Sequence, residues 1–436
     1  MHSSEVKSLS ELTPSVCDKY ITYTIDRLAE RQDQDAERQN IYNRLFKAAR
    51  FIELLYLQGP VLTAIGMRGI PAHPLGGSRA GEVAAECAGR NLGWIPPLPD
   101  EVALPIMNAA WRMLGEPAED VIALQEQCLR AYHFRLSGKP RSATPDGKAK
   151  AAAAVVMAFR FSVIDGETTP WREPVTHEVV EALHKKRSRF KSKREPLQVF
   201  RNLICDIRDA AVITLQSQVG LRVNEICGLD GEWNGATRCP SCIDVRLSKT
   251  ELNEVFFLKG WLSKTRSAKE PVEWVMGMRP VGSNQIPPAV HAVNVLFRLY
   301  QPWRDLAVTR RSLIVGFRHP RGVPRVPEST GPISAVGLLN GFKSFVFRHV
   351  DLSRLPERSA LGEDLREYRS SRGRCLRTHQ WRKTWAHYIY RTDTRMVAAI
   401  AQQFKHLSLA MTEQNYIGSD PYLISTVTIP RQSRGL

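Results

Sequence analysis

This sequence has few cysteines, no long apolar run and no cluster of acidic residues. Its eight cysteines are scattered over 436 residues, a distribution typical of reduced thiols in a cytoplasm. No apolar stretch approaches the roughly 18 residues that a membrane-spanning helix needs, and the start of the sequence shows no signal peptide or acylation motif. No group of carboxylates is placed to hold magnesium. We therefore expect a cytoplasmic protein with no membrane partner, no metal and no cofactor.

One pair of cysteines has the spacing of metal ligands. Cys239 and Cys242 flank a Pro-Ser dipeptide, and Cys227 lies upstream as a third candidate. A structural zinc site usually needs four ligands, and no second pair follows nearby. A turn beside buried thiols is therefore the favoured interpretation, with zinc as the alternative.

The composition is that of a large globular protein with a strong positive charge. Apolar residues make up 43% and charged residues 24%, and the length allows two or three domains. Lys and Arg number 61 against 44 for Asp and Glu, which gives a formal net charge of +17. Such a surplus attracts polyanions and points to nucleic acid as a partner, with a membrane surface as the simpler alternative.

The first 183 residues have helical periodicity interrupted by loops rich in Gly and Pro. Apolar residues recur at helical spacing at Ile41, Leu45, Ala48, Ile52 and Leu55. Further helical patterns cover 101–114, 118–136 and 149–158. We expect residues 1–183 to form a helical DNA-binding region.

A dense basic run follows this region. His184 to Arg194 contains seven fixed positive charges within eleven residues. We interpret 184–195 as an interdomain linker that lies along DNA, with a merely solvated tether as the alternative. The predicted DNA-binding residues are Lys185, Lys186, Arg187, Arg189, Lys191, Lys193 and Arg194.

A second domain is predicted from residue 196. Its first helix ends near Gly220, and Arg222 stands at the start of the next helix with Glu225 three residues on to hold it in position. Short β-rich runs at 255–258 and 271–276 flank a polar segment and predict a hairpin that carries Lys264. Helical patterns resume at 288–306 and 333–349. This part is expected to be mostly helical with a small antiparallel β-sheet.

The segment from residue 378 to residue 416 concentrates polar groups suited to phosphate chemistry. His379 and Arg382 are three residues apart and share a face if the segment is helical. Asp393 is a candidate N-cap for the next helix, and His406 falls where that helix is expected to end. Tyr416 follows as a candidate nucleophile.

Six residues form the candidate catalytic set. Arginines can neutralise the charge that develops on a phosphodiester, histidine and lysine can transfer protons, and tyrosine can form a covalent intermediate. Each residue alone has a simpler interpretation as an ion pair, a helix cap, a solvated lysine or a packing residue. The set is Arg222, Lys264, His379, Arg382, His406 and Tyr416.

The order of these residues resembles the tyrosine recombinase (phage integrase) family. The matching segments are Gly220 to Glu225, Ser263 to Thr265, His379 to Arg382, Lys405 to Thr412, and Tyr416. The resemblance covers roughly residues 196–420, the family's catalytic domain, and leaves 421–436 as a C-terminal tail. One departure is Lys405, which stands where the family usually has glycine.

The resemblance implies a mainly α (α+β) enzyme that recombines DNA at specific sites in integration, excision or transposition of a mobile element. Tyr416 would form a 3′-phosphotyrosine, Arg222 and Arg382 would clamp the phosphate, and Lys264 would protonate the leaving oxygen. His379 would act as acid or base, and His406 would hydrogen-bond the phosphate. A homo- or hetero-tetramer on two DNA sites, accessory proteins and partner recombinases are further family inferences.

Three alternatives remain. A type IB topoisomerase relaxes DNA with a closely similar set of residues. A non-catalytic relative would only bind DNA, although binding alone does not need Tyr416 or His379. An RNA-binding protein suits the charge, but the sequence lacks an aromatic stacking motif.

Overall fold

The structure is a computed structural model that describes residues 8–29, 36–87, 95–137, 145–176, 178–180, 192–236, 238–262, 270–307, 311–318, 322–406 and 412. The chain forms two compact units, residues 1–94 and 95–436. The fold is mainly helical with small antiparallel sheets, which confirms the predicted class. No described helix combines the length and apolarity needed to cross a membrane.

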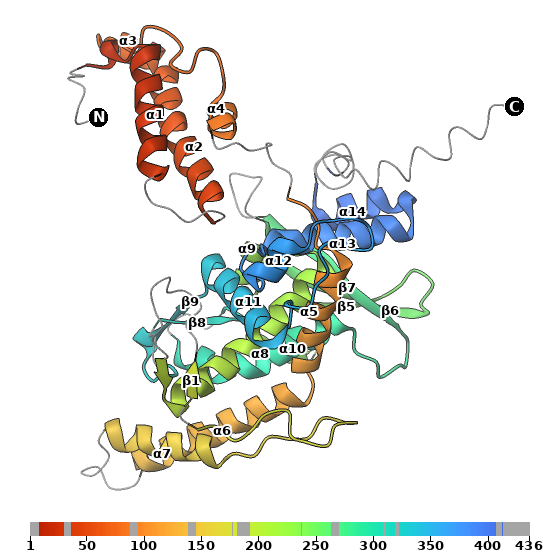
Figure 1. Ribbon diagram of the computed structural model, residues 1–436. Helices are drawn as coiled ribbons and strands as arrows, with labels where there is room; N and C mark the ends of the chain where they lie inside the picture. The colour runs from red at the N-terminus through yellow and green to blue at the C-terminus, as the bar shows by residue number, and fades with distance from the viewer. Residues whose placement is uncertain are drawn as a thin grey trace, which may run out of the picture. The chain divides into compact units, whose positions relative to one another are not determined.

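The first unit is built on a pair of long helices. Helix α1 (Pro14–Ala29) and helix α2 (Ala36–Leu57) lie side by side, and α4 (Ala80–Cys87) packs on α2 (Figure 1). Leu45 and Ile52, from the stripe predicted at 41–55, are buried. Helix α3 (Gly59–Ala64) has Pro60 in its first turn, directly after the end of α2.

Helix α8 (Pro196–Val219) is the centre of the second unit. It packs against α5 (Asp100–Met113), α10 (Pro288–Leu306), α11 (Ala335–His349) and α13 (Thr378–Thr392), which surround it in Figure 1. Most of its residues are buried, because a helix that is apolar on nearly all sides can be covered on all of them. The helices predicted at 101–114, 288–306 and 333–349 are thereby confirmed.

The other helices of the second unit are shorter or more peripheral. They are α6 (Glu116–Ser137), α7 (Pro145–Ala158), α9 (Val223–Cys227), α12 (Arg366–Ser371) and α14 (Val397–Phe404). Asp393 does act as an N-cap, since its side chain accepts a hydrogen bond from the Arg395 amide, but the turn it caps is a 3-10 turn (Thr394–Met396) that precedes α14.

A three-stranded antiparallel sheet confirms the predicted hairpin. Its order is β5 (Ile243–Leu247), β6 (Asn253–Leu262), β7 (Glu270–Pro280). Leu258 and Trp274 pair across β6 and β7 and are buried against the helices. The described residues also form two-stranded ribbons: β1 (Glu178–Val180) with β2 (Ser192–Arg194), β3 (Trp233–Asn234) with β4 (Cys239–Pro240), and β8 (Val315–Phe317) with β9 (Thr330–Pro332).

The division into units differs from the expected domain plan. The boundary between compact units falls at residues 94 and 95, so α5, α6 and α7 belong to the same unit as the residues after 196. The end of the predicted linker, Ser192–Arg194, is strand β2. Residues 181–191 lie outside the described part of the chain, so the boundary predicted at 184–195 stays a prediction.

Candidate active site

The site is built around the turn between α8 and α9. Gly220 ends α8 with a φ of +74°, a conformation that glycine adopts without strain. A Cβ atom at this position would lie 2.6 Å from Cε1 of Phe404, the last residue of α14. Glycine is therefore required twice, for the turn itself and for the close approach of α14.

Arg222 and Glu225 form the local pair that the sequence predicted. Arg222 is the N-cap of α9, and its backbone N–H donates to Glu225 Oε2 at 2.7 Å. Its Nη1 donates to Glu225 Oε1 at 2.8 Å. The side chains are 14% and 4% exposed, so this is a largely buried ion pair with a fixed geometry. The Nε–H of Arg222 is a buried donor that has no acceptor among the described residues.

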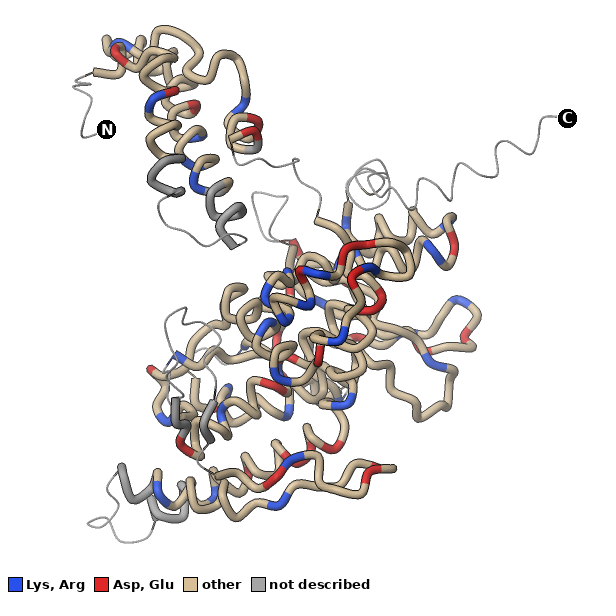
Figure 2. The backbone as a smooth tube through the Cα atoms, viewed as in Figure 1, with Lys and Arg blue, Asp and Glu red and all other residues tan. Residues whose placement is uncertain are grey.

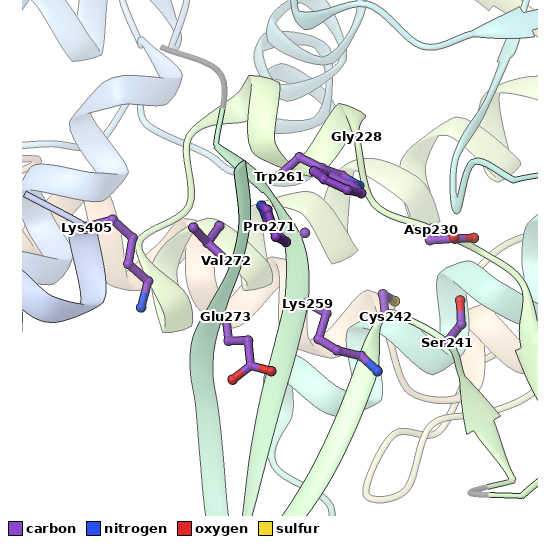
Figure 3. Close-up of a pocket in the computed structure, with 11 residues that line it drawn as sticks. Gly228, Asp230, Ser241, Cys242, Lys259, Trp261, Pro271, Val272, Glu273 and Lys405 are labelled. Atoms are coloured by element: carbon purple, nitrogen blue, oxygen red, sulfur yellow. The ribbon is translucent and has the colours of Figure 1, made fainter. Parts of the chain in front are cut away.

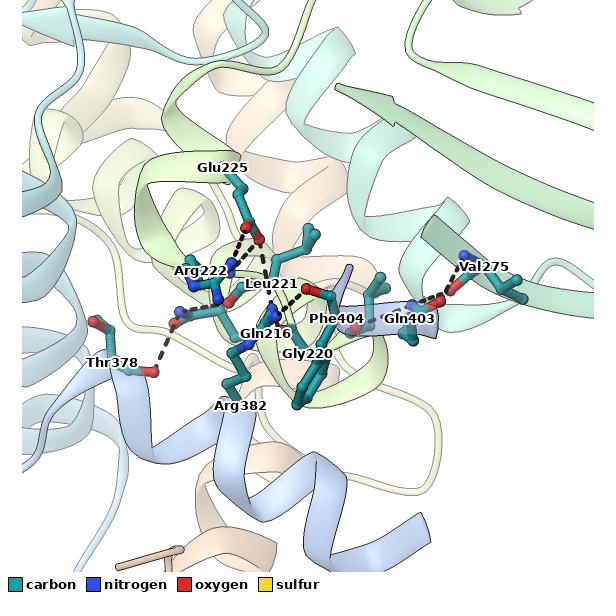
Figure 4. Close-up of polar contacts among 11 residues, drawn as sticks. Gln216, Gly220, Leu221, Arg222, Glu225, Val275, Thr378, Arg382, Gln403 and Phe404 are labelled. Carbon is teal, nitrogen blue, oxygen red and sulfur yellow. Dashed lines mark hydrogen bonds and ion pairs between the residues drawn. The ribbon is translucent and has the colours of Figure 1, made fainter. Parts of the chain in front are cut away.

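Arg382 is completely buried and joins three segments of the chain. Its Nη1 donates to the Gly220 carbonyl oxygen at 2.7 Å and its Nη2 to the Phe404 carbonyl oxygen at 2.9 Å (Figure 4). Nη1 also lies 3.7 Å from Glu225 Oε2. The guanidinium carbon is 3.6 Å from the centre of the Phe404 ring. Arg382 thus fastens the end of α14 to the turn that carries Arg222.

His406 lies just beyond the end of α14, as predicted. Lys405 closes the helix in the left-handed conformation, and the His406 amide donates to the Ala401 carbonyl. His406 Nδ1 lies 2.8 Å from Thr412 Oγ1. Burial, followed by the positive charges of Arg382 and Arg222, lowers the pKa of His406 to about 4. The imidazole is therefore neutral at pH 7.

Two glutamines hold the surrounding segments in place. Gln403 Nε2 donates to the carbonyls of Val219 at 3.1 Å and Val275 at 3.0 Å, and its Oε1 accepts from the Val275 N–H at 3.1 Å. Gln216 Nε2 donates to the Leu221 carbonyl at 3.3 Å. Side-chain amides can satisfy a donor and an acceptor at once, which suits them to joining backbone segments.

The sequence did not predict either glutamine as a site residue. A signal was present for Gln403, which lies three residues after Ile400 and directly before Phe404, on the apolar face of its helix. A polar residue on such a face is buried with its helix and must find hydrogen-bond partners there. The identity of those partners depends on segments more than a hundred residues away.

The structure brings together half of the predicted catalytic set. Arg222, Arg382 and His406 are linked through Glu225, Gly220 and the end of α14, and both arginine charges act on the imidazole. His379 is half-buried in the first turn of α13, one turn before Arg382. Lys264 and Tyr416 lie outside the described residues.

Positive charge continues on the segment that leads into α13. Arg366, Arg369, Arg372, Arg374 and Arg377 fall within the twelve residues before Thr378 (Figure 2). Arg366 is paired with Asp364 at 2.6 Å, whereas the side chains of Arg372 and Arg374 are exposed. Of the predicted DNA-binding run, Lys193 and Arg194 fall in β2, and Lys185, Lys186, Arg187, Arg189 and Lys191 lie outside the described residues.

The cysteine pair lies in and just after β4 (Cys239–Pro240). Burial raises the pKa of the Cys242 thiol to about 12, and Cys239 Sγ lies 3.7 Å from the Ile243 carbonyl oxygen. Among the described residues, no three His, Cys, Asp or Glu side chains are grouped to hold a metal ion. Cys227 has a raised pKa of about 11, also because of burial.

Comparison with known proteins gives distant structural similarities. No protein-family model and no curated protein matches the sequence. Three solved structures are similar to this chain, and all are tyrosine recombinases. The XerA recombinase is 15% identical, with a TM-score of 0.29 over 74% of this chain and 91% of its own.

The other two structures contain DNA. The Tn1549 transposon integrase in complex with transposon right-end DNA is 13% identical, with a TM-score of 0.26 over 70% of this chain and 85% of its own. The XerH site-specific recombinase bound to difH is 11% identical, with a TM-score of 0.24 over 67% of this chain and 68% of its own. These TM-scores mark distant similarities, so the function of this chain has to be argued from its own residues.

Proposed function

We propose that this protein is a site-specific DNA recombinase that cleaves and rejoins DNA through a covalent phosphotyrosine. The observation that supports it best is the convergence of Arg222, Arg382 and His406 from three separate segments. Two guanidinium groups beside a neutral imidazole form a cationic site that can bind a phosphodiester and still exchange protons with it.

The proposed reaction is a transesterification. The Tyr416 oxygen attacks the phosphorus of a DNA phosphodiester and loses its proton, and the bond to the 5′ oxygen breaks. Lys264 gives a proton to that leaving oxygen, so the products are a 3′-phosphotyrosine and a free 5′-hydroxyl. Religation reverses these steps with a 5′-hydroxyl from a second strand. The energy of the phosphodiester is kept in the covalent bond, so no nucleotide is hydrolysed.

The two arginines have different parts in this proposal. Arg222 is partly exposed and keeps donors beyond those that bind Glu225, so it contacts the non-bridging oxygens directly. Arg382 is fully buried and donates to two backbone carbonyls, so it adds positive charge and holds the site together. His406 is neutral and donates a hydrogen bond to the phosphate, and His379 assists proton transfer.

Double-stranded DNA is the proposed partner on account of the net charge of +17 and the basic run at 184–195. Exchange of strands between two sites needs four active subunits, and we propose a homo- or hetero-tetramer assembled on DNA. Integration, excision and transposition are outcomes of the same chemistry. Localisation at the nucleoid would follow from DNA binding.

The test is an adduct assay. The purified full chain, without metal or nucleotide, is incubated with nicked suicide duplexes that carry the ends of its host element. We expect an adduct that survives denaturant, with the DNA joined through its 3′ phosphate to Tyr416. The Tyr416→Phe variant should bind the same DNA and form no adduct. Tight binding by the wild type without any adduct would contradict the catalytic proposal.

A second assay separates recombination from relaxation alone. A topoisomerase would relax a supercoiled plasmid that lacks the specific ends, whereas a recombinase needs those ends and a second site. Relaxation of any plasmid at the rate seen with the specific ends would favour the topoisomerase alternative.

A further inference from the structure

A cavity of about 630 Å³ opens beside β6 and β7 on the side of Lys405. Its walls come from the α9–β3 connection, the β4–β5 connection and the two strands of the hairpin (Figure 3). The volume is within the range of about 300–1,000 Å³ that is usual for small-molecule sites. Since Lys405 directly precedes His406, the cavity adjoins the proposed active site.

An exposed tryptophan forms one wall of this cavity. Trp261 is 48% exposed, whereas its neighbour Leu262 is 4% exposed. Alternation along β6 turns Trp261 away from the core that buries Leu258 and Leu262. A large aromatic side chain at the edge of a cavity offers a flat surface on which a planar ligand can stack.

Two lysines of the cavity have no salt bridge with any described residue. Lys259 lies on the same face of β6 as Trp261, and Lys405 lies at the other side of the cavity in Figure 3. Glu273 is the cross-strand partner of Lys259 in the β6–β7 register. Its carboxylate, however, is held by Arg246 at 2.9 and 2.5 Å. The charge of Glu273 also acts on Lys405, but neither ammonium group is in an ion pair with a described residue, so both can contact an anionic ligand.

Lys405 also has an uncommon backbone conformation. Its φ is +56°, in the left-handed region that favours glycine. Lys405 is the C-cap of α14, and its side chain lines the cavity. Burial lowers the pKa of Lys405, as expected for an amine on a cavity wall.

The cavity contains a polar atom that needs a partner. Ser241 Oγ is buried and has no hydrogen-bond partner among the described residues, and Figure 3 shows it on the same side as Asp230. A buried hydroxyl without a partner costs about 1–3 kcal/mol, which a polar ligand group would recover. Asp230 Oδ1 accepts a hydrogen bond from the Glu232 amide and so has acceptor capacity left.

We propose that this cavity binds one unstacked nucleotide of the DNA substrate. The base stacks on Trp261, Ser241 and Asp230 hydrogen-bond its edge, and Lys259 and Lys405 bind the flanking phosphates. The proposal rests on the proposed function, because it takes DNA to be the substrate and places the nucleotide next to His406. The proposed cavity contacts a base, whereas the six candidate catalytic residues are proposed to act only at the phosphate and its leaving oxygen.

The test compares a base-containing strand with a base-free strand. Fluorescence anisotropy measures the affinity of the full chain for a labelled oligothymidylate of about ten nucleotides, a length within the usual site sizes, and for the same backbone with abasic sites. The wild type should prefer thymidylate by about tenfold, the effect of roughly one stacked base. Trp261→Ala should lose this preference and Trp261→Phe should retain most of it.

Trp111→Ala is the matched control, because Trp111 on α5 is also 48% exposed. It should keep the wild-type preference. Lys259→Ala should weaken binding to both strands, whereas the exposed Lys249→Ala should change neither strongly. A Trp261→Ala variant with an undiminished preference for thymidylate would overturn the proposal.

Two further experiments test whether the bound nucleotide belongs to DNA, and they distinguish this proposal from the proposed recombinase function. An oligonucleotide carrying 5-iodo-deoxyuridine should crosslink to Trp261, and crosslinks confined to other residues would overturn the assignment. If dTMP alone binds as tightly as the oligonucleotide, the cavity is a site for free nucleotide and the DNA assignment fails. The affinity measurements do not require DNA cleavage, so they test nucleotide binding even if no phosphotyrosine adduct forms. Conversely, if the adduct forms normally but the wild type shows no preference for thymidylate, the nucleotide-binding proposal fails.

Discussion

The side-chain amide of Gln403 forms two hydrogen bonds with the backbone of Val275, although 128 residues separate them. The Val275 N–H donates to Gln403 Oε1, and the Val275 carbonyl accepts from Gln403 Nε2. Val275 lies on β7, an outer strand of the sheet. Gln403 therefore occupies the free edge of the hairpin and fixes it to α14, the helix that directly precedes Lys405 and His406.

Gln403→Leu should uncouple the hairpin from α14. The substitution leaves the backbone groups of Val275 and Val219 without partners, at about 1–3 kcal/mol for each buried group. We expect faster hydrogen exchange at the Val275 amide and slower adduct formation on DNA that is still bound. Gln402→Leu is the control, because Gln402 is exposed on the same helix. Equal exchange rates in the two variants would show that the contact does not hold the hairpin.

Glu225→Ala should destabilise the second unit strongly. Glu225 is 4% exposed and is the shared counter-charge of Arg222 and Arg382. Removing one partner of a buried ion pair costs about 3–5 kcal/mol. Chemical denaturation of the full chain should show this loss. Glu254→Ala is the control, since its pair with Arg279 is about a quarter exposed, and it should cost no more than about 1 kcal/mol.

His406 should titrate near pH 4. Its folded pKa lies below the value near 6.5 of an unfolded histidine, so the unfolded chain binds more protons between these values. Its contribution to stability is fully present above about pH 6.5 and is lost as the pH falls through about 4. An NMR titration of the imidazole measures this pKa directly.

Charge removal tests the cause of that shift. Arg222→Ala and Arg382→Ala should each raise the pKa of His406, because each removes a positive charge that disfavours the imidazolium. Arg246→Ala, which removes a cation paired with Glu273 on the sheet, should leave the titration unchanged. If neither substitution changes the pKa of His406, the positive charges of Arg222 and Arg382 do not cause its shift.

Neutralising the basic run at 184–195 should weaken binding to all DNA sequences to the same extent. Replacing the seven Lys and Arg residues between 185 and 194 with Gln removes charges that we expect to contact phosphates. Each lost contact should reduce the slope of log K against log salt by about 0.9. The slope is measured from binding isotherms at several salt concentrations. If it stays the same, the run is a solvated tether.

Most of the helices, the hairpin and the Arg222–Glu225 pair could be predicted from the amino-acid sequence. These features depend on neighbours: helical and strand periodicity is local, Gly220 ends a helix through its own backbone freedom, and residues three apart meet on one helical turn. The motif order from Arg222 to Tyr416 is also the local feature from which we infer the proposed class of chemistry, because that chemistry demands particular residue types.

The contacts among these residues depend on how distant segments of the chain pack together. The burial of Arg382 and its bonds to Gly220 and Phe404 depend on α14 reaching the end of α8. The same approach of α14 lowers the pKa of His406 and gives Gln403 its partners. Such contacts join residues 22 to 184 positions apart, and they arise from the packing of whole helices and strands, which no local pattern specifies.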